Sequence, residues 1–171
     1  MKPIPGGASI GGVIKMVAED ADGKILWEEE FRNSVTSAGL DHMLNVVFRG
    51  TTQVTTWYMG LVDNAGFTQF QAGDTMSSHS GWSESAAYSE STRPAWSPGA
   101  PSSNTISNGT EVEFTINADN TAIRGAFITS NSTKSGTTGT LASTGALSGG
   151  PQTLNTGSKL KLTYSLPMTA T

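Results

Sequence analysis

The chain of 171 residues contains no cysteine, and only 14% of its residues are charged. The absence of cysteine excludes disulfide frameworks, thiolate metal sites and cysteine nucleophiles. No segment approaches the roughly 20 consecutive apolar residues that a membrane-spanning helix needs. The first residues also lack the apolar region of a signal peptide, so we expect a protein made in the cytoplasm that has no membrane partner.

Positive charge is also scarce. Ten Lys and Arg residues stand against fourteen Asp and Glu residues, which gives a formal net charge of −4. The basic residues are scattered and form no stripe that could neutralise phosphates, so nucleic acid is not expected as a direct partner. Acidic residues gather at 19–22 and 28–30, where they could face a basic partner, although a solvated hairpin face explains them more simply.

Gly, Ser and Thr are abundant, and this composition favours strands and turns over helices. Residues 13–18 and 24–31 alternate apolar and polar side chains around an Asp22-Gly23 turn, which predicts a β-hairpin. Residues 111–117 and 122–129 alternate in the same way around Asp119-Asn120 and predict a second hairpin. Further strands are expected at 55–62, 93–96, 140–147 and 159–167, with Gly60 marking a bulge or a close backbone approach.

One segment follows a helical period instead. Five apolar residues recur at helical spacing within 33–50, and Thr36 or Ser37 is available as the N-cap: the five are Leu40, Met43, Leu44, Val47 and Phe48. This pattern predicts an amphipathic helix of about three turns. With about eight strands, the expected fold class is all-β, an antiparallel and jelly-roll-like β-sandwich with one short α-helix. The Pro- and Gly-rich residues 1–12 predict an extended arm, and residues 13–171 predict a single sandwich domain.

Residues suited to catalysis are few. His42 and His79 are the two histidines, and His79 lies near Ser77 and Asp74 in a serine-rich loop where such a trio arises readily by chance. Two pairs of carboxylates, Glu28 with Glu30 and Glu111 with Glu113, have a spacing that a glycosidase could use, but both should lie on solvated strand faces. The sequence Asp20-Ala-Asp22-Gly23 is better explained as a hairpin turn than as a calcium loop. We therefore expect no catalytic residue, no metal and no cofactor.

The segment 73–96 is the most unusual part of the sequence. It contains three large aromatic side chains but no periodic apolar pattern, and loops of this length are uncommon in compact domains unless they are functional or disordered. Its aromatic rings must pack on a neighbouring sheet or on another protein chain. We interpret the segment as an assembly surface.

Several short motifs from Asn33 onward are similar to those of one family. They are Asn33-Ser-Val-x-x-x-Gly39-Leu40, Trp57-Tyr58-x-Gly60-Leu61, Gly73-Asp74-Thr75-Met76, Gly81-Trp82, Arg93-Pro94-x-Trp96, Ile106-Ser107-Asn108 and Arg124-Gly125-Ala126-Phe127-Ile128. Together they resemble the capsid cement, or head decoration, proteins of tailed bacteriophages. The resemblance implies a β-rich protein without an enzymatic site that forms a homodimer or homotrimer. It also implies assembly in the host cytoplasm and a place on the capsid surface of the virion, where the protein clamps adjacent subunits of the major capsid protein.

On this interpretation the contacts with partners come from two regions. The arm would contribute Pro3, Ile4 and Pro5, and the long loop would contribute Trp82, Tyr88, Arg93 and Trp96. The alternative function is a host-binding or glycan-binding adhesin domain, on a tail fibre or displayed on the capsid, which would need Trp82 or Trp96 exposed as a stacking platform. A tail-tube or head-completion protein is a third possibility.

Overall fold

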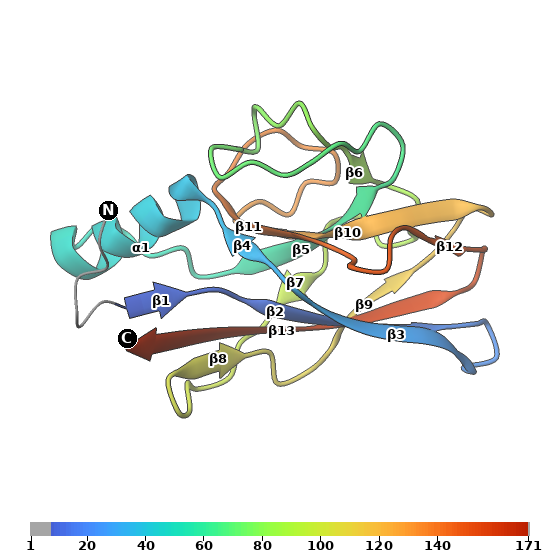
Figure 1. Ribbon diagram of the computed structural model, residues 1–171, viewed down its shortest axis with the longest axis horizontal. Helices are drawn as coiled ribbons and strands as arrows, with labels where there is room; N and C mark the ends of the chain where they lie inside the picture. The colour runs from blue at the N-terminus through green and yellow to red at the C-terminus, as the bar shows by residue number, and fades with distance from the viewer. Residues whose placement is uncertain (1–7, 171) are drawn as a thin grey trace.

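The computed structural model describes residues 8–170, which form two antiparallel sheets packed face to face with a helix at one end (Figure 1). One sheet contains β1 (Ala8–Ile10), β2 (Val13–Glu19), β3 (Ile25–Arg32), β8 (Thr105–Ser107), β9 (Val112–Thr115) and β13 (Lys159–Ala170). The other contains β4 (Ser34–Val35), β5 (Trp57–Asp63), β6 (Glu84–Ser85), β7 (Ala95–Trp96), β10 (Thr121–Thr129), β11 (Leu141–Ala146) and β12 (Gln152–Leu154). The helix is α1 (Ser37–Arg49). The predicted fold class, an all-β antiparallel sandwich with one short helix, is confirmed.

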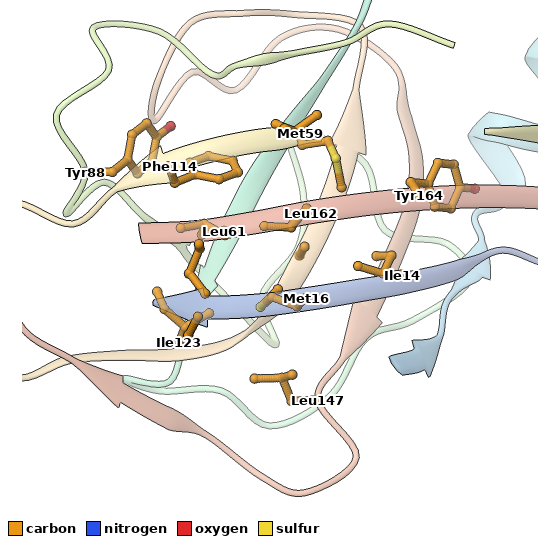
Figure 2. Close-up of a cluster of buried hydrophobic side chains, with 14 of the residues drawn as sticks. Ile14, Met16, Met59, Leu61, Tyr88, Phe114, Ile123, Leu147, Leu162 and Tyr164 are labelled. Atoms are coloured by element: carbon orange, nitrogen blue, oxygen red, sulfur yellow. The ribbon is translucent and has the colours of Figure 1, made fainter. Parts of the chain in front are cut away.

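The main core lies between the two sheets. Alternate residues of β2 and β13 point inward from the first sheet, and residues of β5 and β10 meet them from the second (Figure 2). Ile14, Met16, Leu61, Ile123 and Leu162 are completely buried there. Burying a side chain of this size contributes about 1.5–3 kcal/mol, so these alternating strands hold the sheets together.

The predicted hairpin at the start of the domain is confirmed as β2 and β3. Its turn is built by Asp20, whose Oδ1 accepts hydrogen bonds from the backbone N–H groups of Asp22 (3.0 Å) and Lys24 (2.9 Å). Gly23 takes a positive φ of 82°, which glycine adopts without steric cost. The acidic residues of this turn therefore serve the hairpin.

The second predicted hairpin is wrong. β9 pairs with β13 in the first sheet, whereas β10 pairs with β5 and β11 in the second. The turn near Asn120 (φ 58°) thus carries the chain from one sheet to the other. Both strands still bury their apolar faces in the core, through Phe114 and Ile123. Alternation reveals which face of a strand is buried but not which strand lies beside it.

The predicted arm falls partly outside the described residues, and Pro3, Ile4 and Pro5 are among those not described. Residues 8–10 form β1, which pairs with the C-terminal end of β13 in the register Ala8 to Ala170 and Ile10 to Met168. This part of the predicted arm therefore belongs to the first sheet.

Gly60 in β5 lies in close contact with the Phe127 side chain of the neighbouring strand. A Cβ at this position would lie 2.2 Å from the ring of Phe127, its neighbour on β10. We expect Gly60→Ala to lower the free energy of unfolding by about 1–3 kcal/mol, as over-packing in a core does. Urea unfolding measures this, with Gly11→Ala as the matched control because a Cβ at Gly11 meets nothing within 4 Å. Equal stability of the two variants would contradict the prediction.

Candidate interaction surface

The long segment after β5 covers the outer face of the second sheet, so β10 is buried on both sides. Figure 1 shows this segment above β5 and β10. A second apolar cluster lies beneath it, formed by Val62, Met76, Trp82, Phe127 and Leu141, with Phe67 and Phe70 packed against it. The aromatic residues of the loop therefore pack on the chain's own sheet, which was one of the two alternatives that the sequence allowed.

Trp82 is the centre of this outer cluster. Its ring lies 5.1 Å from the Phe127 ring and stacks on His79 at 4.0 Å between centroids. Its Nε1–H donates to Asp74 Oδ2 (2.9 Å), and Asp74 also accepts from the Gln71 backbone N–H (2.9 Å). With only 4% of its surface exposed, Trp82 fastens the loop to the sheet.

The residues around Trp82 also show how Ser77, His79 and Asp74 are arranged. Thr75 and Ser78 pair with each other across a tight turn. The trio of Ser77, His79 and Asp74 is not assembled as a triad. His79 Nδ1 bonds to the Trp82 carbonyl oxygen (3.0 Å), while Asp74 is bound to the Trp82 ring.

A buried ion pair fastens the other half of the loop. Arg93 donates to both carboxylate oxygens of Glu84, at 2.9 Å and 2.7 Å, and both side chains are almost fully buried. The remaining guanidinium N–H groups donate to the carbonyl oxygens of Asn131 and Gly136, each at 2.9 Å. Bidentate pairs of this kind are among the stronger and more directional polar contacts. Arg93 thereby joins three segments of the chain.

Tyr88 and Trp96 belong to the core between the sheets. The Tyr88 ring lies 5.0 Å from the Phe114 ring, and the Trp96 ring lies 5.3 Å from the Tyr164 ring. Trp96 Nε1–H donates to Asn108 Oδ1 (3.2 Å). Both rings fill the interior of the sandwich.

The prediction that these loop side chains bind a partner is therefore corrected. Trp82, Tyr88, Arg93 and Trp96 each expose no more than 6% of their surface. A side chain with so little accessible surface cannot supply contact area to another molecule. Composition alone had not distinguished packing on the chain's own sheets from packing on a partner.

Burial of Tyr88 has a consequence for pH dependence. Burial, together with the nearby Glu84 carboxylate, raises the pKa of Tyr88 above its usual 10.0. The neutral phenol thus stabilises the folded state fully below pH 10, and this contribution is lost as the pH rises further. Between pH 9 and pH 11, we expect the free energy of unfolding, measured with urea, to fall less for Tyr88→Phe than for the wild type. Parallel pH profiles for the two proteins would contradict this.

The helix α1 confirms its predicted place and its cap. Thr36 is the N-cap, since its Oγ1 accepts from the Gly39 backbone N–H (3.1 Å), and Gly50 ends the helix with a φ of 64°. The first turn packs closely on β11, where a Cβ at Gly39 would lie 2.4 Å from the Ala142 carbonyl oxygen. The helix is thus anchored at its N-terminal end and extends from one end of the sandwich (Figure 1).

One face of this helix is apolar and uncovered. Leu40, Leu44, Val47 and Phe48, here called the helix stripe, expose 38%, 55%, 70% and 78% of their surfaces. They follow one another at helical spacing and form a contiguous row. Single exposed apolar residues need no explanation, but a row of four large ones is a candidate interaction site.

An apolar hollow lies next to the helix stripe, and Val47 belongs to both. This helix groove has a volume of about 350 Å³ and lies between α1 and the end of the sandwich. Met43 and Val46 line it from the helix, while Trp57, Ile106 and Leu166 line it from the sheets. His42 packs edge-on against Trp57, with 5.4 Å between ring centroids. The stripe and the groove together make this end of the protein strongly apolar.

The sequence contained a signal for this surface that the helical period alone did not use. Ala38 and Val46, which the predicted helical pattern did not include, lie outside the helix stripe, as does Met43, so α1 carries apolar residues on more than one face. A helix with one apolar stripe buries that stripe against one surface, whereas this helix has apolar residues on two sides that would each need a packing surface. The sandwich provides cover on the side of Gly39 and Met43 only.

No family model and no curated protein sequence matches this chain. Within residues 8–170 there is no group of three His, Asp or Glu side chains placed to bind a metal ion. Within the same residues, no helix has the length and the apolar character that are needed to cross a membrane. The apolar end of the sandwich, formed by the helix stripe and the helix groove, is the candidate functional site because of its exposed apolar surface.

Proposed function

We propose that this chain is a virion structural protein of the capsid cement class. It binds the outside of a tailed-phage head and clamps adjacent subunits of the major capsid protein. The observation that carries the proposal is the uncovered helix stripe beside the helix groove, which is an apolar surface suited to contact another protein. The sequence motifs that resemble those of cement proteins are the reason for proposing the capsid as the binding partner.

The rest of the chain supports a mechanical role. The outer face of the second sheet is covered by a loop that Trp82 and Arg93 fasten with buried contacts, so the body is braced on both sides. A clamp needs such a rigid body because force applied at one contact must reach the next one. A symmetric oligomer that touches several capsid subunits makes its later contacts intramolecular and gains avidity without a large single interface.

Copy number in purified virions tests the proposal. Quantitative mass spectrometry should find this chain in hundreds of copies per particle, in a fixed ratio to the major capsid protein. Purified protein added to empty expanded heads should bind in a saturable way and raise their resistance to heat or osmotic shock. A few copies per particle, or no binding to heads, would overturn the proposal.

The adhesin alternative loses the support that the sequence gave it. Stacking on a sugar requires an exposed aromatic ring, and Trp82 and Trp96 expose only 4% and 6% of their surfaces. The Ser-, Thr- and Gly-rich segment 131–139, a candidate binding loop for an adhesin, is also bound to the rest of the chain by hydrogen bonds. Lys134 Nζ donates to the Tyr88 carbonyl oxygen (2.6 Å), and Arg93 donates to the Asn131 and Gly136 carbonyl oxygens.

A further inference from the structure

We infer that Asn108 is a spontaneous deamidation site, which the folded protein protects and which converts unfolded chains into a form unable to refold. Asn108 and Gly109 form the only Asn-Gly pair in the sequence. The side-chain amide of Asn108 is buried and joins the two sheets. Such a reaction would limit the lifetime of the protein whatever its partner is, so it does not depend on the capsid role.

Every hydrogen-bonding position of the Asn108 amide is occupied. Its Oδ1 accepts from the Trp96 Nε1–H on β7 (3.2 Å) and from the Tyr164 backbone N–H on β13 (2.7 Å). Its Nδ2 donates to the carbonyl oxygens of Thr110 (2.8 Å) and Leu162 (3.1 Å). An asparagine side chain offers two donors and two acceptor lone pairs, so no position is left over. The amide therefore binds the second sheet to the first through bonds that fix its orientation.

Deamidation requires the Gly109 backbone nitrogen to attack Cγ of Asn108. A C–N bond then forms and closes a succinimide ring, the bond from Cγ to Nδ2 breaks, and this nitrogen leaves as ammonia with the proton of the backbone N–H. Water next opens the ring at one of its two carbonyl carbons, which leaves aspartate or isoaspartate at this position. Glycine favours ring closure because it has no side chain to crowd the attack and its backbone is unusually free.

The folded protein hinders both reacting atoms. The hydrogen bonds of the amide hold Asn108 inside the sandwich, so its Cγ cannot turn toward the Gly109 nitrogen without breaking them. The Gly109 N–H donates to the Ser97 carbonyl oxygen (3.4 Å). Asn108 exposes only 9% of its surface, so the water that opens the ring also has little access. Deamidation therefore requires this part of the sandwich to open first.

The product cannot make the same contacts. A carboxylate would turn an oxygen toward the carbonyl oxygens of Thr110 and Leu162, where Nδ2 now donates, and would place a negative charge in a buried position. Isoaspartate also lengthens the backbone between β8 and β9, which both pair with β13, and so disturbs their register. A chain that deamidates while unfolded should therefore fail to refold, and unfolding then becomes an irreversible loss.

The rate of deamidation in the folded and unfolded states is the first test. Wild-type protein is incubated at one mildly alkaline pH with and without guanidinium chloride, and its chymotryptic fragment 97–114 is followed by mass spectrometry. In the unfolded protein Asn108 should be the first asparagine to convert. In the folded protein its conversion should be at least about 100-fold slower, because the unfolded fraction of a folded protein is about 10⁻³ or less. Equal rates in the two states, or earlier conversion of another asparagine, would overturn the inference.

Refolding after incubation tests the consequence. The fraction of chains that refold on dilution should fall in step with the fraction converted at Asn108. Gly109→Ala is the matched control, because a Cβ at this position meets nothing within 4 Å in the folded protein but crowds the attack on Cγ. This variant should fold like the wild type, convert several-fold more slowly and keep its refolding yield for longer. If converted chains refold as completely as fresh ones, the inference is wrong.

Asn108→Asp produces the aspartate form directly. The midpoint of its unfolding in guanidinium chloride should fall by about 1 M or more, since a charge then replaces a fully bonded amide in the core. Asn104→Asp is the matched control because Asn104 is exposed, and it should leave the midpoint unchanged. An Asn108→Asp variant that does not fold agrees with the inference, whereas one with the wild-type midpoint contradicts it. None of these measurements involves a partner, so their outcome is separate from that of the capsid-binding test.

Discussion

Replacing Arg93 with alanine is expected to destabilise the protein by about 3–5 kcal/mol. The substitution leaves the buried Glu84 carboxylate with the Ser135 backbone N–H as its close donor but without a cation, and a buried charge that has lost its ionic partner costs more than the ion pair itself contributes. It also removes the donors to the carbonyl oxygens of Asn131 and Gly136. For a chain of this length the melting temperature should fall by roughly 10 °C, measured by calorimetry.

Two control variants identify the cause of this loss. The double variant Arg93→Met with Glu84→Gln removes both charges and should recover part of the stability, since the isolated buried charge is then absent. Lys15→Ala breaks an exposed pair with Glu28 (3.4 Å) and should change the stability by less than about 1 kcal/mol. If Arg93→Ala cost no more than Lys15→Ala, the buried pair would not be a structural contact of the kind described.

The parts of the fold that could be predicted from the sequence are those fixed by local chemistry. The β2–β3 hairpin follows from alternation and from a turn whose Asp20 and Gly23 have a specific stereochemical task. The helix follows from its apolar period and from its caps at Thr36 and Gly50. In each case the residues that determine the structure are close together in the chain, so a short window contains the whole signal.

Long-range pairing could not be predicted in the same way. β9 and β10 are consecutive strands with matching patterns, yet β13 pairs with β9 from more than forty residues later in the chain. Alternation is satisfied equally well by either neighbour, because both arrangements bury Phe114 and Ile123 in the same core. The choice depends on the closure of the whole sandwich, which no short window contains.

The candidate site shows a related limit. An aromatic residue in a loop and an apolar residue on a helix both indicate burial, but the sequence does not state whether the covering surface belongs to the same chain. Here the loop residue Trp82 is covered by the chain's own sheet, while the helix residue Phe48 is left exposed. The Ala126-Phe127-Ile128 run of β10 was the available clue, because a strand that is apolar on both faces needs a covering layer on each side.

Replacing Trp82 with alanine is expected to release the outer loop while the sandwich stays folded. Trp82 contributes the largest ring of the outer cluster, and truncating a buried Trp costs about 3–5 kcal/mol. That cost falls on residues 64–83, which precede the Glu84–Arg93 ion pair and the core residue Tyr88, so this part of the loop should open before the core does. Limited digestion with chymotrypsin measures this opening. Trypsin is unsuitable because residues 64–83 contain no Lys or Arg, whereas Phe67 and Phe70 are cleavage sites for chymotrypsin.

Trp82→Phe is the matched variant because it keeps an aromatic ring over Phe127 but removes the N–H that Asp74 accepts. Asp74 retains its bond from the Gln71 backbone N–H, so we expect an intermediate rate of cleavage. Hydrogen exchange on the same samples should show faster exchange in 64–83 and unchanged protection of β2 and β13, whose core contacts do not include Trp82. If cleavage of Trp82→Ala within the loop were as slow as in the wild type, the loop would be held by its other contacts and Trp82 would not be its main anchor. If exchange rose equally in β2 and β13, the loop and the sandwich would unfold as one unit.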